Sequence, residues 1–82
     1  MKNPKRGEIW KNGTLYYFIF LIVKDMNTDN KRVVFQQLTK DEEMIIHCVG
    51  GEILSVKIRQ PISMELKTFK EKMIRFKEAP KR

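Results

Sequence analysis

The sequence predicts a mainly β domain with one C-terminal α-helix, in which five strands form a strongly bent antiparallel sheet or a small barrel. Three observations favour this fold class: a run of nine apolar and aromatic residues from Leu15 to Val23, turn signals that separate short β-prone segments, and a helical spacing of apolar residues after Pro61. The chain has 82 residues, 41% of them hydrophobic, which suits a single small core. We therefore expect one domain over residues 7–78, flanked by short basic tails at 1–6 and 79–82.

Turn signals divide the chain before Pro61 into strands. Asn12-Gly13 marks the first hairpin, because both central positions of a type I′ turn need a positive φ that Asn and Gly tolerate. The polar cluster Asp25–Asn30 and the pair Gly50-Gly51 predict two further turns, and the acidic stretch Thr39–Glu43 is expected to be a loop. The expected strands are Glu8–Lys11, Leu15–Lys24, Arg32–Leu38, Met44–Val49 and Glu52–Arg59.

After Pro61 the apolar spacing changes to that of a helix. Proline cannot donate to a strand ladder, so it ends the fifth strand, and Ser63 is expected to cap the helix that follows. The helix is expected over about 63–77, with polar residues opposite its apolar stripe. That stripe contains Leu66, Phe69, Met73 and Phe76.

The run from Leu15 to Val23 lacks the alternation of a half-exposed strand, so both of its faces need cover. Folded as a helix it would reach only about 14 Å, which is too short for a bilayer, and no membrane association is expected. The interior of the sheet or barrel is expected to cover Leu15, Tyr17, Ile19, Leu21 and Val23. The opposite face is left to the C-terminal helix or to a second protein chain. Its residues form the predicted protein interface: Tyr16, Phe18, Phe20 and Ile22.

The net charge of +7 makes nucleic acid an alternative partner. Residues 1–6 carry three basic side chains, residues 67–82 carry seven against two acidic ones, and the segment between them is close to neutral. Basic ends of this kind can contact RNA or DNA phosphates without reading sequence, whereas a solvated charged helix is the simpler interpretation. The predicted nucleic-acid contacts are Lys57, Arg59, Lys67, Lys70, Lys72, Arg75 and Lys77.

The expected arrangement resembles small SH3-like barrels. KRGEIW, at residues 5–10, is similar to the opening of PemK/MazF-type endoribonuclease toxins, which also have a five-stranded core and commonly dimerise. That family places an Arg-Pro pair with a catalytic arginine where this chain has residues 15–17, Leu-Tyr-Tyr, so the resemblance implies the fold and not the activity. The motifs G-x-L-Y, V-V-F-Q-x-L and R-x-P-x-x-M resemble a short bacterial domain family of unknown function. They lie at Gly13–Tyr16, Val33–Leu38 and Arg59–Met64.

No residue set in the sequence predicts catalysis, a metal or a cofactor. His47 is the only histidine, and no spacing gives it the carboxylate or nucleophile partner that a general base requires. Cys48, the only cysteine, is expected to be a buried small hydrophobe, and neither paired zinc ligands nor a calcium loop is found. We therefore expect no enzyme, no cofactor and no small-molecule substrate. The single cysteine and the lack of a secretory signal pattern favour a cytoplasmic protein.

These patterns favour a non-catalytic small barrel that binds a protein partner or forms a homodimer, encoded by a bacterium or a mobile element. Self-association would use the region Leu15–Val23. The alternatives are non-specific RNA or DNA binding through the basic helix and tails, and a PemK/MazF-like endoribonuclease with displaced catalytic residues.

Overall fold

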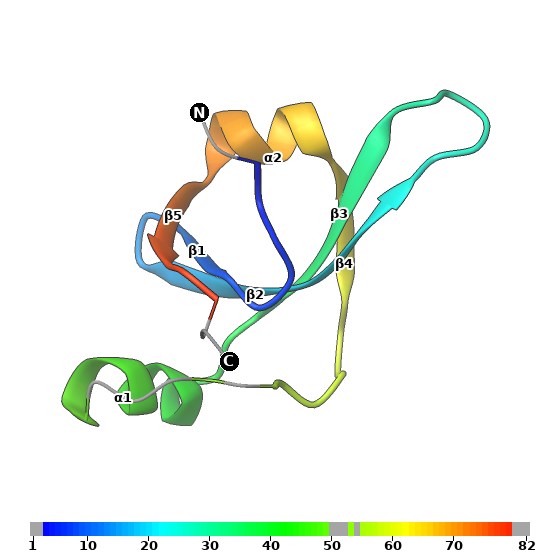
Figure 1. Ribbon diagram of the computed structural model, residues 1–82. Helices are drawn as coiled ribbons and strands as arrows, with labels where there is room; N and C mark the ends of the chain where they lie inside the picture. Colours follow the sequence, from blue (N-terminus) through cyan, green and yellow to red (C-terminus); the bar gives the residue numbers. More distant parts are fainter. Residues whose placement is uncertain (1–2, 50–52, 54, 80–82) are drawn as a thin grey trace.

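A computed structural model describes residues 3–49, 53 and 55–79, and Figure 1 shows how its elements are arranged. The elements are β1 (Ile9–Asn12), β2 (Leu15–Lys24), β3 (Lys31–Gln37), α1 (Lys40–Val49), β4 (Ile62–Glu65), α2 (Leu66–Lys72) and β5 (Ile74–Lys77). The strands form one open antiparallel sheet in the order β4-β3-β2-β1-β5. The predicted fold class is confirmed, because the chain is mainly β, has five antiparallel strands and carries a helix towards its C-terminal end.

The sheet uses partly different segments from those expected. β2 has the expected bounds, and β1 and β3 are each displaced by one residue. The expected strand Met44–Val49 is wrong, since these residues belong to α1, and the described residues of Glu52–Arg59 form no strand. β4 and β5 come instead from the two ends of the segment expected to be one helix over about 63–77.

A capping box starts α1 in the stretch that was expected to be an acidic loop. The Thr39 Oγ1 accepts a hydrogen bond from the Glu42 N–H at 3.2 Å, and Glu42 Oε1 accepts one from the Thr39 N–H at 2.8 Å. This reciprocal pair satisfies two backbone donors that a helix start leaves open. Three acidic residues in the first turn also stabilise the helix through its dipole, and a basic residue type, His47, lies in the last turn. The apolar residues from Met44 to Val49 favour a strand when taken alone, but the Thr-x-x-Glu signal before them starts a helix.

The apolar stripe after the proline supports a helix of only seven residues. Ser63 does not cap it: this residue lies in β4, where its Oγ accepts a hydrogen bond from Arg32 Nε at 2.8 Å. The helix ends at Met73, whose backbone is extended at φ −115° and ψ 152°. From Ile74 onwards apolar and basic residues alternate with the period of a strand, and pairing with β1 stabilises that conformation. Phe76 therefore lies on β5 and not on the helix.

Two hydrophobic clusters lie on opposite faces of the sheet, and β2 contributes to both. α2 covers one face, whereas α1, together with Ile53 and Val56, lies over the other (Figure 1). The apolar run in β2 is therefore covered from both sides by its own chain at residues 17–19, while Leu15 stays 43% exposed. The first cluster contains Trp10, Tyr17, Ile19, Val33, Phe35, Phe69 and Met73. The second cluster contains Ile9, Phe18, Leu38, Ile46, Ile53 and Val56.

A β-bulge in β2 changes the alternation of its side chains. The register with β3 shifts between Ile19 and Leu21, so that Phe20 and Leu21 together oppose one residue of β3. Leu21 thereby lines the same pocket as Phe20, while Ile22 packs against the first cluster. The expectation that Leu21 lies beside Ile19, and Ile22 beside Phe20, is wrong because strict alternation holds only in a strand without a bulge.

Gln36 holds the segment 57–60 against the sheet in place of a strand ladder. Its side chain is 2% exposed. Its Nε2 donates to the Lys57 carbonyl at 2.9 Å, and its Oε1 accepts from the Arg59 N–H at 2.7 Å and the Gln60 N–H at 2.9 Å. Both polar atoms of the buried amide thus have partners, and three backbone groups of an otherwise irregular segment gain partners.

Replacing Gln36 with Leu should lower the free energy of unfolding by at least about 2 kcal/mol, because it leaves these three backbone groups without a partner. Urea unfolding followed by fluorescence of the buried Trp10 measures the change. Gln37→Leu is the matched control, since Gln37 is the exposed neighbour on the same strand. Equal effects of the two substitutions would contradict the role assigned to Gln36.

The pKa of Glu42 is lowered from its ordinary value of 4.5. Partial burial raises it, but hydrogen bonds from the Thr39 N–H and the Arg59 guanidinium outweigh that effect. A lowered pKa means that the charged carboxylate stabilises the folded state above about pH 4.5, and that this stabilisation is lost as the pH falls through the lower folded-state pKa. The melting temperature of the wild type should therefore decline more steeply with acidification than that of Glu42→Gln. Thermal unfolding by circular dichroism at a series of pH values checks this, and parallel curves would contradict it.

Candidate functional site

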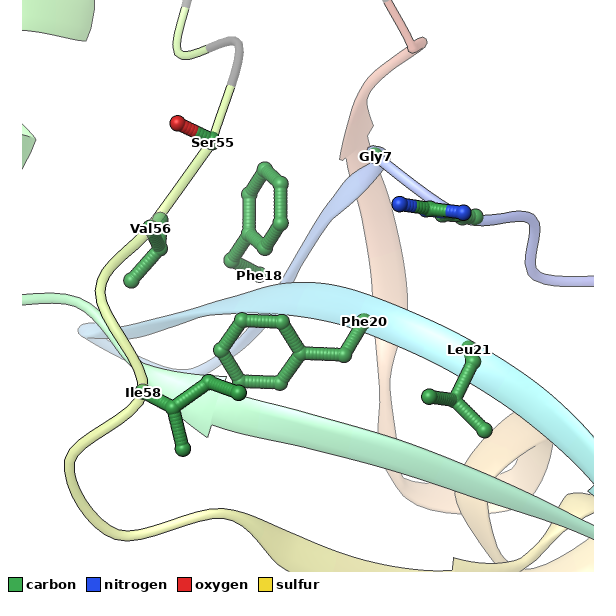
Figure 2. A pocket seen from close by; sticks show the side chains of 8 residues that line it. Gly7, Phe18, Phe20, Leu21, Ser55, Val56 and Ile58 are labelled. Atoms are coloured by element: carbon green, nitrogen blue, oxygen red, sulfur yellow. The ribbon is translucent and has the colours of Figure 1, made fainter.

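A shallow pocket of about 360 Å³ opens beside the bulge in β2. Its walls come from β2, from the chain just before β1, and from the segment that Gln36 holds. Figure 2 shows the rings of Phe18 and Phe20 lying between β2 and the backbone that carries Val56 and Ile58. We call this pocket the β2 groove. It is lined by Arg6, Gly7, Phe18, Phe20, Leu21, Ser55, Val56 and Ile58.

The β2 groove has a buried apolar floor and an exposed apolar rim. Phe18 and Val56 are 4% and 8% exposed and belong to the second cluster. At the rim, Leu21 is 42% exposed and Ile58 is 69% exposed. When another surface covers apolar side chains that are exposed to water beside a pocket, their removal from water is favourable. The geometry therefore suits the binding of an apolar group.

The N-terminal wall of the groove is fixed by a buried carboxylate. Glu8 is 3% exposed, and its Oε1 accepts hydrogen bonds from the Lys5 N–H at 2.8 Å and from Trp10 Nε1 at 3.1 Å. Its Oε2 pairs with Arg75 at 3.5 Å. Gly7, the residue before Glu8, has φ 88°, a conformation that glycine adopts readily, and its N–H donates to the Ile19 carbonyl at 2.9 Å.

The opposite wall is tied both to the sheet and to α1. The Arg59 guanidinium donates to Glu42 Oε1 at 2.8 Å and to the Gln37 carbonyl at 3.2 Å. Together with the Gln36 contacts, this pair fixes the backbone that carries Val56 and Ile58. The groove is therefore built from three stretches of chain that lie far apart in the sequence.

The four residues of the predicted protein interface do not share one exposed face. Phe18 is buried in the second cluster and Ile22 packs against the first, so the expectation that both face outward is wrong. Tyr16 is half-buried and meets the rings of His47 and Phe76 edge-on, each with centroids 5.0 Å away. Phe20 alone among the four lines the groove in a half-buried position. The C-terminal helix covers the face of Tyr17 and not that of Phe18, contrary to expectation.

The residues of the predicted nucleic-acid surface are divided between two sides of the sheet. Lys57 and Arg59 lie on the segment beyond the second cluster, whereas Lys67, Lys70 and Lys72 lie on α2, which covers the first. Several are engaged within the chain: Arg59 with Glu42, Arg75 with Glu8 and Glu78, and Lys70 with Asn3. Lys77 on β5 is half-buried, and Lys67 and Lys72 are exposed.

The remaining chemistry-bearing residues form no described site. His47 is exposed and packs against Phe76 at 5.5 Å, and the side chain of Cys48 lies outside the described part of the structure. Within residues 3–49, 53 and 55–79, no group of three His, Cys, Asp or Glu side chains is placed to hold a metal ion. In the same residues, no helix has the length and apolar character needed to cross a bilayer.

The sequence predicts only part of the β2 groove. Phe18 and Phe20 belong to the predicted interface, whereas no sequence pattern links Arg6, Leu21 and Ile58 in one surface. The alternation of Leu54, Val56 and Ile58 did signal that one side of this segment faces apolar neighbours. Its position against Phe20 depends on contacts of Gln36 and Arg59 with distant residues, for which the sequence carries no recognisable pattern.

No family model, curated protein or solved structure matches the chain.

Charged substitutions at two β2 positions, Phe18 and Leu21, should differ strongly in their effect on stability. Phe18→Glu should prevent stable folding, with a loss of more than about 4 kcal/mol, because it buries an unpaired charge. Leu21→Glu should change stability by less than about 1 kcal/mol, since the side chain is 42% exposed. Circular dichroism and urea unfolding distinguish the two. A folded Phe18→Glu protein would contradict the described floor of the groove.

Proposed function

We propose that this chain is a non-catalytic interaction module that binds a protein segment in the β2 groove. The observation that supports this function best is the exposed apolar rim, Leu21 and Ile58, above an apolar floor. Binding sites combine such apolar concavity with few polar groups. Arg6 is the only charged residue among the described residues that line the groove.

The strand order also supports an SH3-like barrel as the scaffold of this module. β4 and β5 flank the three-stranded β1–β2–β3 meander, and the short helix α2 connects them. A fold does not determine function, so the proposal depends on the groove and not on this likeness. A cytoplasmic setting in a bacterium or a phage-infected cell completes the proposal, since one cysteine allows no intramolecular disulfide.

Nucleic-acid binding is the rival interpretation, with Lys67, Lys70 and Lys72 on α2 as its phosphate contacts. Two of the arginines it would use are already paired with carboxylates. The basic residues also lie on two sides of the sheet, so one strand of RNA or DNA would not reach all of them together. The groove, in contrast, gathers its apolar residues on one side. No contact in the described part of the chain favours a toxin-like nuclease.

Selection from a random peptide library displayed on phage tests the proposed function directly. Peptides that bind the wild type should lose at least about tenfold in affinity for Ile58→Asn, because burial of an apolar side chain contributes about 1.5–3 kcal/mol and each 1.4 kcal/mol is tenfold. Ile74→Asn is the matched control. Ile74 is the same residue type, is 66% exposed against 69% for Ile58, and lies on β5 outside the groove.

Three outcomes would overturn the proposed function. Selection at a concentration where the chain is monomeric could yield no binder, or the binders could respond equally to Ile58→Asn and Ile74→Asn. A mixed-sequence RNA could also bind at low salt and be lost in a Lys67/Lys70/Lys72→Gln variant while peptides are ignored, which would favour the nucleic-acid interpretation.

A further inference from the structure

Arg6 differs from the other arginines in the described part of the chain. Arg32 donates to Ser63, Arg59 pairs with Glu42, and Arg75 pairs with Glu8. The Arg6 side chain makes no hydrogen bond or ion pair with another described residue, yet it lines the apolar β2 groove. A guanidinium beside an apolar hollow recognises a carboxylate well, because its planar donors match the two carboxylate oxygens.

The same molecule carries a surface with the complementary chemistry. On α1, Asp41 is exposed, Met44 is 58% exposed and Ile45 is 44% exposed. These residues stand at positions i, i+3 and i+4, so they share one side of the helix. A helix that binds in a groove uses this spacing of anchors, and here it presents two apolar side chains and one carboxylate.

The groove and α1 lie on the same side of the sheet. Ile46 of α1 packs into the second cluster together with Phe18 and Val56, which form the groove floor. In a two-fold symmetric contact, each copy offers both halves of the contact to the same neighbouring molecule. The placement of α1 and the groove on one side of the sheet is compatible with such a contact.

We propose that the occupant of the β2 groove is α1 of a second copy of this chain. In the homodimer, Met44 and Ile45 of one protomer cover Leu21 and Ile58 of the other, and Asp41 pairs with Arg6. The contact occurs twice around a two-fold axis. This inference rests on the proposed function of the groove and specifies its partner.

Other occupants fit these observations less well. A nucleic-acid strand needs several cations along its path, and the described lining of the groove contains one. A C-terminal carboxylate is captured by clustered backbone N–H groups, and the Gly7 N–H at this rim already donates to Ile19. The side-chain carboxylate of Asp41 needs neither several cations nor a cluster of free backbone N–H groups.

Solution mass by light scattering over a dilution series, with a charge exchange, tests the homodimer. The wild type should dimerise, and Arg6→Glu or Asp41→Arg should each weaken dimerisation by at least about tenfold, as expected for loss of a charged hydrogen bond. The double variant Arg6→Glu/Asp41→Arg restores opposite charges across both contacts and should recover the dimer. Recovery also excludes damage to α1 as the cause, because Arg6→Glu cannot repair a helix in its own chain.

Two further substitutions keep the test specific. Ile45→Asn should weaken the dimer without touching the pair of charges, whereas Ile74→Asn should leave it unchanged. Lys5→Gln removes a cation next to Arg6 that does not line the groove and should also have no effect. A folded wild type that stays monomeric, or a dimer indifferent to Arg6→Glu and Ile45→Asn, would overturn the homodimer. If peptides still bind the groove of a monomer, the proposed function stands and only the occupant is wrong.

Discussion

The rest of the structure depends on the apolar character of both faces of β2. A strand with Tyr17 and Ile19 on one face and Phe18 on the other is stable in water only when two layers cover it. α2 supplies one layer, and α1 with Ile53 and Val56 supplies the second. The positions of the two helices over the sheet therefore follow from the requirement to shield this strand, whereas β4 and β5 are placed by pairing with β3 and β1.

The fold class could be predicted because its strongest signals are local. The hairpin signal at Asn12-Gly13, the length of the run in β2 and the turn after Lys24 are local, and the first three strands follow from them. The predicted turn is wrong by one residue: Asn12 pairs with Leu15 at the end of β1, and Gly13, at φ 62°, and Thr14 form the turn. The C-terminal part was harder, since Ile74–Lys77 has both helical and strand spacing, and pairing with β1 decides between them. α1 is different: Thr39 and Glu42 carried a local signal that the neighbouring apolar run concealed.

The candidate site was less predictable than the fold because it depends on contacts between distant residues. The bulge moves Leu21 to the side of Phe20, and a shift of one residue in register cannot be read from an uninterrupted apolar run. Ile58 is held in the same place by contacts of its neighbours with Gln36, more than twenty residues away in the sequence, and with Glu42. Composition could indicate that β2 needs partners, but it could not show which residues would remain exposed after the chain had supplied its own.

The segment 57–60 is held by the side chains of Gln36 and Arg59 and not by a strand ladder, and this affects how the groove can change in evolution. A paired strand transmits every insertion or deletion along its ladder, whereas a segment anchored through the Gln36 amide needs only three backbone groups in place. Exposed residues in or just before this segment, such as Ile58 and Ser55, can therefore change in type while the sheet keeps its register and Val56 keeps its place in the second cluster. The contacts that determine the architecture are thus separate from the exposed residues that line the β2 groove, so the rim of the groove can change without a new fold.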